Sequence, residues 1–107
     1  MNQRLEKLKE MERQKPDDAF VKFAIAQEYV NTHKDEKAVV YFELLLEAFP
    51  EYVPTYYQFG KLYERINDFT AAANVYKKGI VVAKIANDLK TAGELNEALM
   101  LVEDEQG

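Results

Sequence analysis

The sequence repeats itself at a spacing of 34 residues, and this repeat constrains the fold more than any other feature. Residues of similar size recur when the chain is shifted by that distance. The matching pairs are Pro16 and Pro50, Ile25 and Phe59, Ala26 and Gly60, Tyr29 and Tyr63, Ala38 and Ala72, Phe42 and Tyr76, and Leu46 and Ile80. A period in this range is typical of a supersecondary unit that stacks on copies of itself. The sequence therefore predicts one structural unit that occurs twice.

Each copy has the apolar spacing of helices. Apolar residues recur every three or four positions in AFVKFAIAQEYV, EKAVVYFELLLEAF, VPTYYQFGKLYERI and FTAAANVYKKGIVVAKIA, as on one face of a helix. A weaker stripe of Leu5, Leu8 and Met11 marks a first helix. A last helix follows Asn87 and Asp88, with Leu89, Ala92, Leu95, Leu99 and Val102 at steps of three and four. No strand-type alternation competes with these patterns. Because the breaks are short, sequential helices should pack antiparallel, which predicts an all-α chain of about six helices.

The breaks between these segments carry helix-boundary signals. Proline lacks an amide hydrogen and clashes with the preceding turn, so Pro16 should end the first helix. Asp17 or Asp18 can then cap the next helix with a side-chain oxygen, and Asp68, and further on Asn87 or Asp88, are placed to do the same. Pro54 suits the first turn of its helix, where the missing amide hydrogen costs little.

Composition excludes several classes of protein. The chain has 107 residues, of which 48% are apolar and 31% are charged, as expected for a single globular domain. Its net charge of −5, with lysines scattered singly or in pairs, argues against nucleic-acid binding. No apolar run approaches the ~20 residues that a membrane helix needs, and the N-terminus does not resemble a secretory signal. We therefore expect no membrane insertion and a cytoplasmic protein.

The residues needed for catalysis are scarce. The chain contains no serine and no cysteine, and its one histidine, His33, lies in the predicted turn NTHKD. The acidic pair Asp17–Asp18 and the run 103–105 fall at helix ends, where capping or a solvated tail explains them better than acid–base chemistry. Neither a calcium loop nor a glycine-rich phosphate loop is present. We expect no enzymatic activity, no cofactor and no metal site.

Gly60 interrupts an apolar helix at a cost of roughly 1 kcal/mol relative to alanine. Its repeat equivalent, Ala26, is also small, and Ala72 follows on the next helix. We expect Gly60 and Ala72 to lie where the two helices of one pair cross closely. Tyr63 and Tyr76 would then fill the space on either side.

This order of large and small residues resembles the tetratricopeptide repeat, whose pattern is W-x2-L-G-x2-Y, A-x3-F and a later proline. The residues that fit the pattern are Ile25, Ala26, Tyr29, Ala38, Phe42 and Pro50 in the first copy, and Tyr56, Phe59, Gly60, Tyr63, Ala72 and Tyr76 in the second. Lys22 replaces the tryptophan of the first copy. Lys84 replaces the proline of the second, which indicates that its last helix runs on past the usual stop.

The resemblance implies a right-handed α-α superhelix of antiparallel helix pairs in a single domain, 1–107. Its expected parts are an N-terminal capping helix (1–15), a first repeat (17–50), a second repeat (51–84) and a C-terminal capping helix (87–104). Because about three repeats are normally needed for stability, the capping helices must supply further apolar surface.

The resemblance also implies a function, which is binding a peptide or helix of a partner protein in a concave groove lined by the first helix of each repeat. The groove residues that it indicates are Phe20, Phe23, Gln27, Val30, Asn31, Tyr57, Lys61, Glu64 and Arg65. Phe23 and Tyr57 stand where members that bind chaperone tails tend to be polar, which favours an apolar ligand.

Two alternatives remain open at this point. Phe20 and Phe23 could be covered by the N-terminal helix or by a second subunit, and Lys61, Glu64 and Arg65 could form a solvated, self-paired face. The competing function is therefore a self-assembling, homodimeric structural protein whose groove or ends are filled by its own chain.

Overall fold

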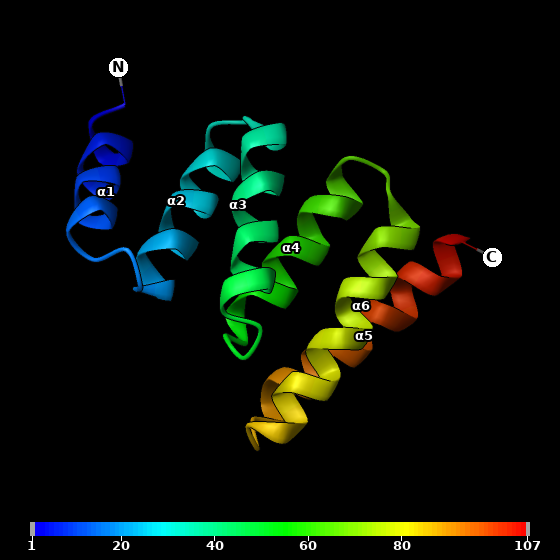
Figure 1. The fold of residues 1–107 in the computed structure, drawn as a ribbon. Coiled ribbons are helices and arrows are strands. Elements are labelled where there is room, and N and C mark those ends of the chain that lie inside the picture. The colour runs from blue at the N-terminus through cyan, green and yellow to red at the C-terminus, as the bar shows by residue number, and fades with distance from the viewer. Residues whose placement is uncertain (1, 107) are drawn as a thin grey trace. The chain divides into compact units, whose positions relative to one another are not determined.

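The computed structural model describes residues 2–106, and these form six α-helices and no strand (Figure 1). The helices are α1 (Gln3–Gln14), α2 (Ala19–Asn31), α3 (Asp35–Ala48), α4 (Pro54–Arg65), α5 (Phe69–Ile85) and α6 (Leu89–Gln106). The predicted all-α class and the number of helices are confirmed. No helix in this part of the chain is both long enough and apolar enough to cross a membrane.

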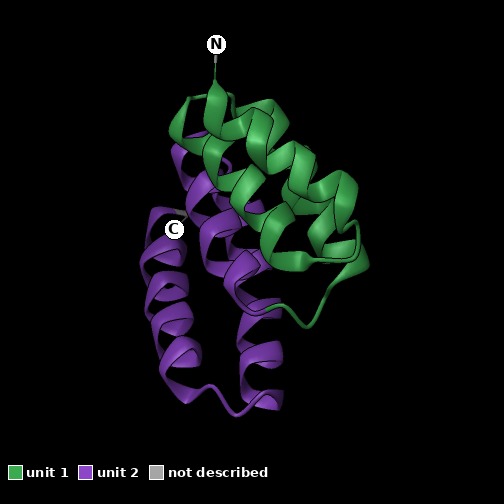
Figure 2. Cartoon of the chain, turned by 90° about the vertical axis from the view of Figure 1, so that its left-hand side faces the viewer, with its two compact units in different colours: residues 1–52 green, residues 53–107 purple. Residues whose placement is uncertain are grey.

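The helices fall into two compact units that divide after Tyr52 (Figure 2). Unit 1 (1–52) contains α1, α2 and α3, and unit 2 (53–107) contains α4, α5 and α6. Within each unit, sequential helices pack against one another. The boundary lies close to the start of the predicted second repeat.

The predicted helix starts are confirmed atom by atom. Asp18, and not Asp17, caps α2: its carboxylate accepts the amide hydrogen of Phe20 at 3.0 Å. Asp68 caps α5 through the amide of Ala71 at 3.1 Å, and the carboxylate of Asp88 accepts the amide hydrogen of Thr91, in the first turn of α6, at 3.1 Å. Pro54 is the first residue of α4. Each carboxylate thus pairs an amide that has no partner inside its helix.

Three short turns share one left-handed backbone geometry. The backbone φ angles of His33, Asn67 and Asn87 are 59°, 65° and 59°. In each turn the amide of the next residue bonds back to a helix carbonyl five positions earlier, at 2.9 Å for Lys34 and 2.8 Å for Asp68 and for Asp88. This bond closes a Schellman motif, which satisfies carbonyls at the helix end and usually favours glycine at the left-handed position.

The core of unit 1 lies between α2 and α3. It contains Val21, Ile25, Ala26, Tyr29, Ala38, Phe42 and Leu45, all buried. In contrast, no residue of α1 is fully buried: of the expected apolar stripe, Leu5 and Leu8 are half-buried and Met11 is exposed. Polar contacts add to this partial apolar packing: Glu12 accepts from Lys22 Nζ and from the Tyr41 hydroxyl, both at 2.9 Å.

In unit 2, α5 packs against both α4 and α6. Gly79 lies where α5 approaches both neighbours closely, because a Cβ there would lie 2.5 Å from Tyr56 Cβ on α4 and 3.0 Å from Leu95 Cδ1 on α6. The helix spans 17 residues against 14 in its repeat equivalent α3, which confirms that it runs on past Lys84. The long α5 therefore offers packing surface to a third helix.

Gly60 does lie where α4 meets α5, but the group that it admits differs from the expectation. A Cβ on Gly60 would overlap ring carbon Cε1 of Tyr76 and lie 2.5 Å from its Cζ. The ring of Tyr76 therefore sits directly on the glycine. Tyr63 does not flank this contact in the same way, since its ring stacks on Phe59 with centroids 4.4 Å apart.

Candidate functional site

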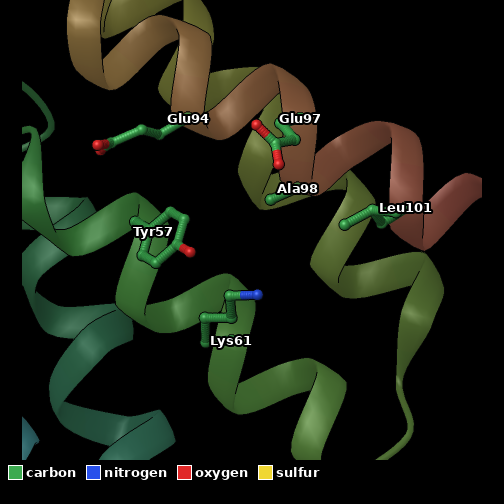
Figure 3. Close-up of a pocket in the computed structure, with 6 residues that line it drawn as sticks. All are labelled: Tyr57, Lys61, Glu94, Glu97, Ala98 and Leu101. Atoms are coloured by element: carbon green, nitrogen blue, oxygen red, sulfur yellow. The ribbon is translucent and has the colours of Figure 1, made fainter.

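A pocket of about 390 Å³ opens between α4 and α6 of unit 2 (Figure 3). One wall is formed by Tyr57 and Lys61, and the other by Glu94, Glu97, Ala98 and Leu101. The helix spacing explains both walls, because residues three, four and seven apart share one face of a helix. The structure thus brings two of the predicted groove residues, Tyr57 and Lys61, into one site.

A closed set of four side chains fixes the α4 wall. The Tyr76 hydroxyl donates a hydrogen bond to the Glu64 carboxylate, and the ring centroids of Tyr76 and Tyr57 lie 6.3 Å apart. Lys61 Nζ lies 3.7 Å from Glu64 Oε2 and 5.4 Å from the centroid of Tyr57. We call Tyr57, Lys61, Glu64 and Tyr76 the α4 network.

Electrostatics keep the central phenol of this network protonated. Burial raises the pKa of Tyr76 well above its usual value, and the hydrogen bond to the Glu64 carboxylate raises the pKa further. The phenol therefore remains a donor, and Glu64 stays oriented toward both Tyr76 and Lys61. The aromatic wall is positioned before any ligand arrives.

The α6 wall combines two carboxylates with apolar surface. Glu94 and Glu97 are exposed, and neither forms a hydrogen bond or ion pair within residues 2–106. Leu101 is 60% exposed, whereas Ala98 is buried. The sequence analysis missed this wall because it treated α6 only as a cap. The available signal was the spacing of residues 94, 97, 98 and 101.

Two predicted α4 residues lie outside the pocket lining. Glu64 is half-buried and acts through the α4 network, while Arg65 is exposed at the end of α4. Lys61 pairs with Glu64, as the self-paired alternative predicted, yet it also lines the pocket. The two readings of Lys61 are therefore compatible.

The predicted groove residues of α2 differ in how much of each side chain is exposed. Phe20 is 63% exposed, so α1 does not cover it. Phe23 is half-buried, with its ring 6.2 Å from Phe42 and 5.8 Å from Tyr52. Gln27 and Val30 are half-buried, and Asn31 is exposed. Phe23 thus contributes to the packing of unit 1 as well as to its surface.

His33 lines a second surface pocket together with Lys34, Asp35, Glu36 and Lys37. His33 occupies a left-handed turn position and is exposed. Across residues 2–106, no group of three or more His, Cys, Asp or Glu side chains could hold a metal ion.

Comparison with known proteins agrees with the repeat pattern. A family model described as tetratricopeptide repeat matches residues 53–81. No curated protein matches the chain.

Solved structures give wider matches. A tetratricopeptide repeat domain protein from Salinibacter ruber, solved by NMR, is 39% identical with a TM-score of 0.80, over 83% of this chain and 90% of that one. Its crystal structure is 40% identical with a TM-score of 0.76, over 80% and 97%. The TPR2B domain of yeast Sti1, solved as a complex with pHsp70, shares the fold at 15% identity and a TM-score of 0.86, over 94% and 81%.

The family follows from these matches together with the packing. The identity to the Salinibacter ruber domain extends over nearly all of that domain. The repeated small and large residues that suggested the family, Ala26 with Phe42 and Gly60 with Tyr76, are buried where α2 meets α3 and where α4 meets α5. The chain belongs to the tetratricopeptide repeat family.

Proposed function

We propose that this chain binds a peptide or helix of a partner protein, and that the pocket between α4 and α6 is a contact site. Tetratricopeptide repeats are in general protein–protein interaction modules, and the family is typically non-enzymatic. The proposal for this chain concerns the site at which the partner binds and the chemistry of the bound segment.

The observation that carries the proposal is the open pocket beside a pre-positioned tyrosine. Tyr57 is held by Tyr76 and Lys61, so it loses little conformational freedom on binding. Leu101 stands opposite with most of its surface exposed. Aromatic and aliphatic anchors of this kind commonly carry most of the energy of a peptide contact.

The yeast Sti1 domain offers a precedent for the class of partner, because it was solved with pHsp70 bound. At 15% identity this likeness extends to the fold alone. For the present chain we propose a partner segment with apolar side chains, since Tyr57 and Leu101 face the pocket.

The exposed face of α2 is a separate part of the proposal. Phe20, Phe23, Gln27, Val30 and Asn31 would contact the partner from unit 1. Phe20 is the strongest candidate among them, because an aromatic side chain with this much exposed surface gains most from burial.

A peptide display library, selected on the wild-type protein, tests the pocket. Leu101→Glu should abolish binding of the selected peptides, because it places a charge where an apolar anchor is needed. Val81→Glu is the matched control, since Val81 is an exposed aliphatic residue of α5 outside the pocket. Retained binding by Leu101→Glu would remove the pocket from the proposal.

Self-association is the second candidate function, and the exposed Phe20 favours it. A homodimer that buries this side chain should dissociate in Phe20→Glu. Sedimentation equilibrium of the two proteins decides the matter: a monomeric wild type excludes self-association, and a dimer that Phe20→Glu converts to monomer supports it.

A further inference from the structure

We propose that this protein self-associates, with the exposed face of α3 in one copy packed against the exposed face of α5 in a second copy. The inference goes beyond the proposed function, because it involves neither the pocket between α4 and α6 nor the exposed residues of α2. Two observations carry it: both faces contain exposed aliphatic side chains, and the charges on the two faces are opposite.

The exposed face of α3 combines carboxylates with aliphatic side chains. Residues at steps of three and four share one side of a helix. The exposed residues on this side, which we call the α3 face, are Glu36, Val40, Glu43, Leu44 and Glu47. Val40 is 52% exposed and Leu44 is 46% exposed. Neither Glu43 nor Glu47 forms an ion pair within residues 2–106.

The exposed face of α5 has the same kind of aliphatic surface but carries cations. Its members, which we call the α5 face, are Asn74, Lys77, Lys78, Val81, Lys84 and Ile85. Val81 is 58% exposed, and Ile85, which lies where α5 runs on past the length of α3, is 81% exposed. The sequence of α5 contains no acidic residue. Lys77 lies 3.9 Å from Glu103, whereas Lys78 has no ion-pair partner among the described residues.

The repeat register shows that the charge is reversed at equivalent positions. A shift of 34 residues places Glu43 on Lys77 and Leu44 on Lys78. Two α3 faces, or two α5 faces, would meet with like charges, whereas an α3 face and an α5 face meet with opposite charges. One chain therefore supplies both halves of the contact, which is what association of identical copies requires.

The aliphatic residues give such a contact its driving force. Val40 and Leu44 are four residues apart on α3, as are Val81 and Ile85 on α5, so each face presents two adjacent aliphatic side chains. Removing this surface from water is favourable in proportion to the area buried. The charges around the aliphatic residues select the partner face, and the aliphatic residues hold it.

Sedimentation equilibrium of the full chain tests the association. We expect a dimer or larger assembly whose dissociation constant rises about 3- to 10-fold when sodium chloride is raised from low to high concentration, because salt screens the opposite charges. A wild type that stays monomeric from micromolar to millimolar concentration overturns the inference.

A charge-swapped pair of variants identifies the faces. Glu43→Lys/Glu47→Lys makes both faces of one protein basic, and Lys78→Glu/Lys84→Glu makes both faces of the other acidic. Each variant alone should associate at least about 10-fold more weakly than the wild type, since like charges now meet. An equimolar mixture should associate again, because the basic faces of one variant meet the acidic faces of the other. A mixture that stays monomeric overturns the assignment.

Two matched controls separate the faces from general effects of charge and apolar surface. Asp104→Lys/Glu105→Lys changes the net charge by the same amount on the exposed surface of α6 and should associate as the wild type does. Ile85→Ser should weaken association about 10-fold, whereas Met100→Ser, at a residue of α6 that is 60% exposed, should not. Equal losses in a variant and its control contradict the proposed faces.

Phe20→Glu separates this contact from association through α2. The variant should associate as the wild type does, because Phe20 belongs to neither face. Association that Phe20→Glu abolishes runs through α2 and overturns the inference. Peptide binding in the pocket between α4 and α6 is measured separately, so the proposed function stands or falls on its own.

Discussion

The two hairpins, α2–α3 and α4–α5, have equivalent contacts between their helices, but the residues that form these contacts differ in polarity. In unit 2, Gly60 admits the ring of Tyr76, whose hydroxyl bonds to Glu64. At the equivalent positions, unit 1 has Ala26, Phe42 and Val30. A methyl group, a phenyl ring and an aliphatic side chain thus replace a glycine, a phenol and a carboxylate.

The aromatic contact itself is preserved between the hairpins. The rings of Phe23 and Phe42 lie 6.2 Å apart, and the rings of Tyr57 and Tyr76 lie 6.3 Å apart. The polar residues beside these rings differ between the two hairpins. Gln27 occupies the place of Lys61, and Val30 occupies that of Glu64, so unit 1 has no equivalent of the Lys61–Glu64 ion pair; the Oε1 of Gln27 is buried without a hydrogen-bond partner among the described residues. The two hairpins therefore keep the same spacing between their aromatic rings but differ in the polar groups around those rings.

The largest expected effect concerns Gly60. Gly60→Leu should destabilise the chain by about 2–3 kcal/mol, because any Cβ there overlaps the ring of Tyr76. Gly93→Leu is the matched control, since a Cβ at Gly93 meets nothing within 4 Å, and helix propensity alone should stabilise it. Urea unfolding measures both variants. Similar effects at the two glycines would show that Tyr76 yields and that the close contact is not needed.

Introducing the hydroxyl of Tyr76 at the equivalent position of unit 1 should lower the free energy of unfolding by somewhat less. Phe42→Tyr buries a hydroxyl where no carboxylate faces it, so we expect a loss of about 1–2 kcal/mol. Val30→Glu in the same protein should recover part of this loss by recreating the Glu64–Tyr76 pair in unit 1. A double-mutant cycle measures the coupling, and a coupling near zero would break the proposed equivalence of the hairpins.

The tyrosines predict a loss of stability in alkali. Burial and a glutamate partner raise the pKa of Tyr76 in unit 2 and of Tyr41 in unit 1. Above pH 10 the unfolded phenols lose their protons while the folded ones retain them, so rising pH favours unfolding. Tyr76→Phe should flatten the fall in unfolding free energy between neutral pH and pH 11. An unchanged pH profile in Tyr76→Phe would contradict this assignment.

The smallest expected effect concerns the equivalent turns at His33 and Asn67. His33→Gly should stabilise by about 0.5–1 kcal/mol, since glycine adopts a positive φ without steric cost. Asn67→Gly should gain less, because asparagine already tolerates this conformation. Thermal unfolding compares the two. A larger gain at Asn67 would indicate that local contacts, and not the backbone, set the cost.

Sequence alone predicted what depends on local rules. Caps such as Asp68, the start of α4 at Pro54 and the extension of α5 follow from backbone hydrogen bonding and from the missing proline. The family followed because the small and large residues recur in register. Tyr57 and Lys61, which were predicted as groove residues, share one face of α4 because they are four residues apart, and both line the pocket.

The rest depended on contacts between helices that no local pattern contains. Glu94 and Glu97 look like ordinary solvated residues in the sequence, and only the packing of α6 against α5 places them in the lining of the same pocket as Tyr57. The contact of Gly60 with a ring was not separable in advance from a contact with backbone. The left-handed turn at His33 lacks the glycine that would have marked it.

The polar attachment of α1 makes this helix the segment of unit 1 most sensitive to its surroundings. Glu12 of α1 pairs with Lys22 and Tyr41, and Arg4 Nε lies 3.1 Å from Glu28 Oε1, whereas its apolar residues Leu5 and Leu8 are only half-buried. Ion pairs are screened by salt, whereas apolar burial is not. Its amides should therefore exchange with solvent sooner than those of α2 and α3, and ionic strength should widen that gap.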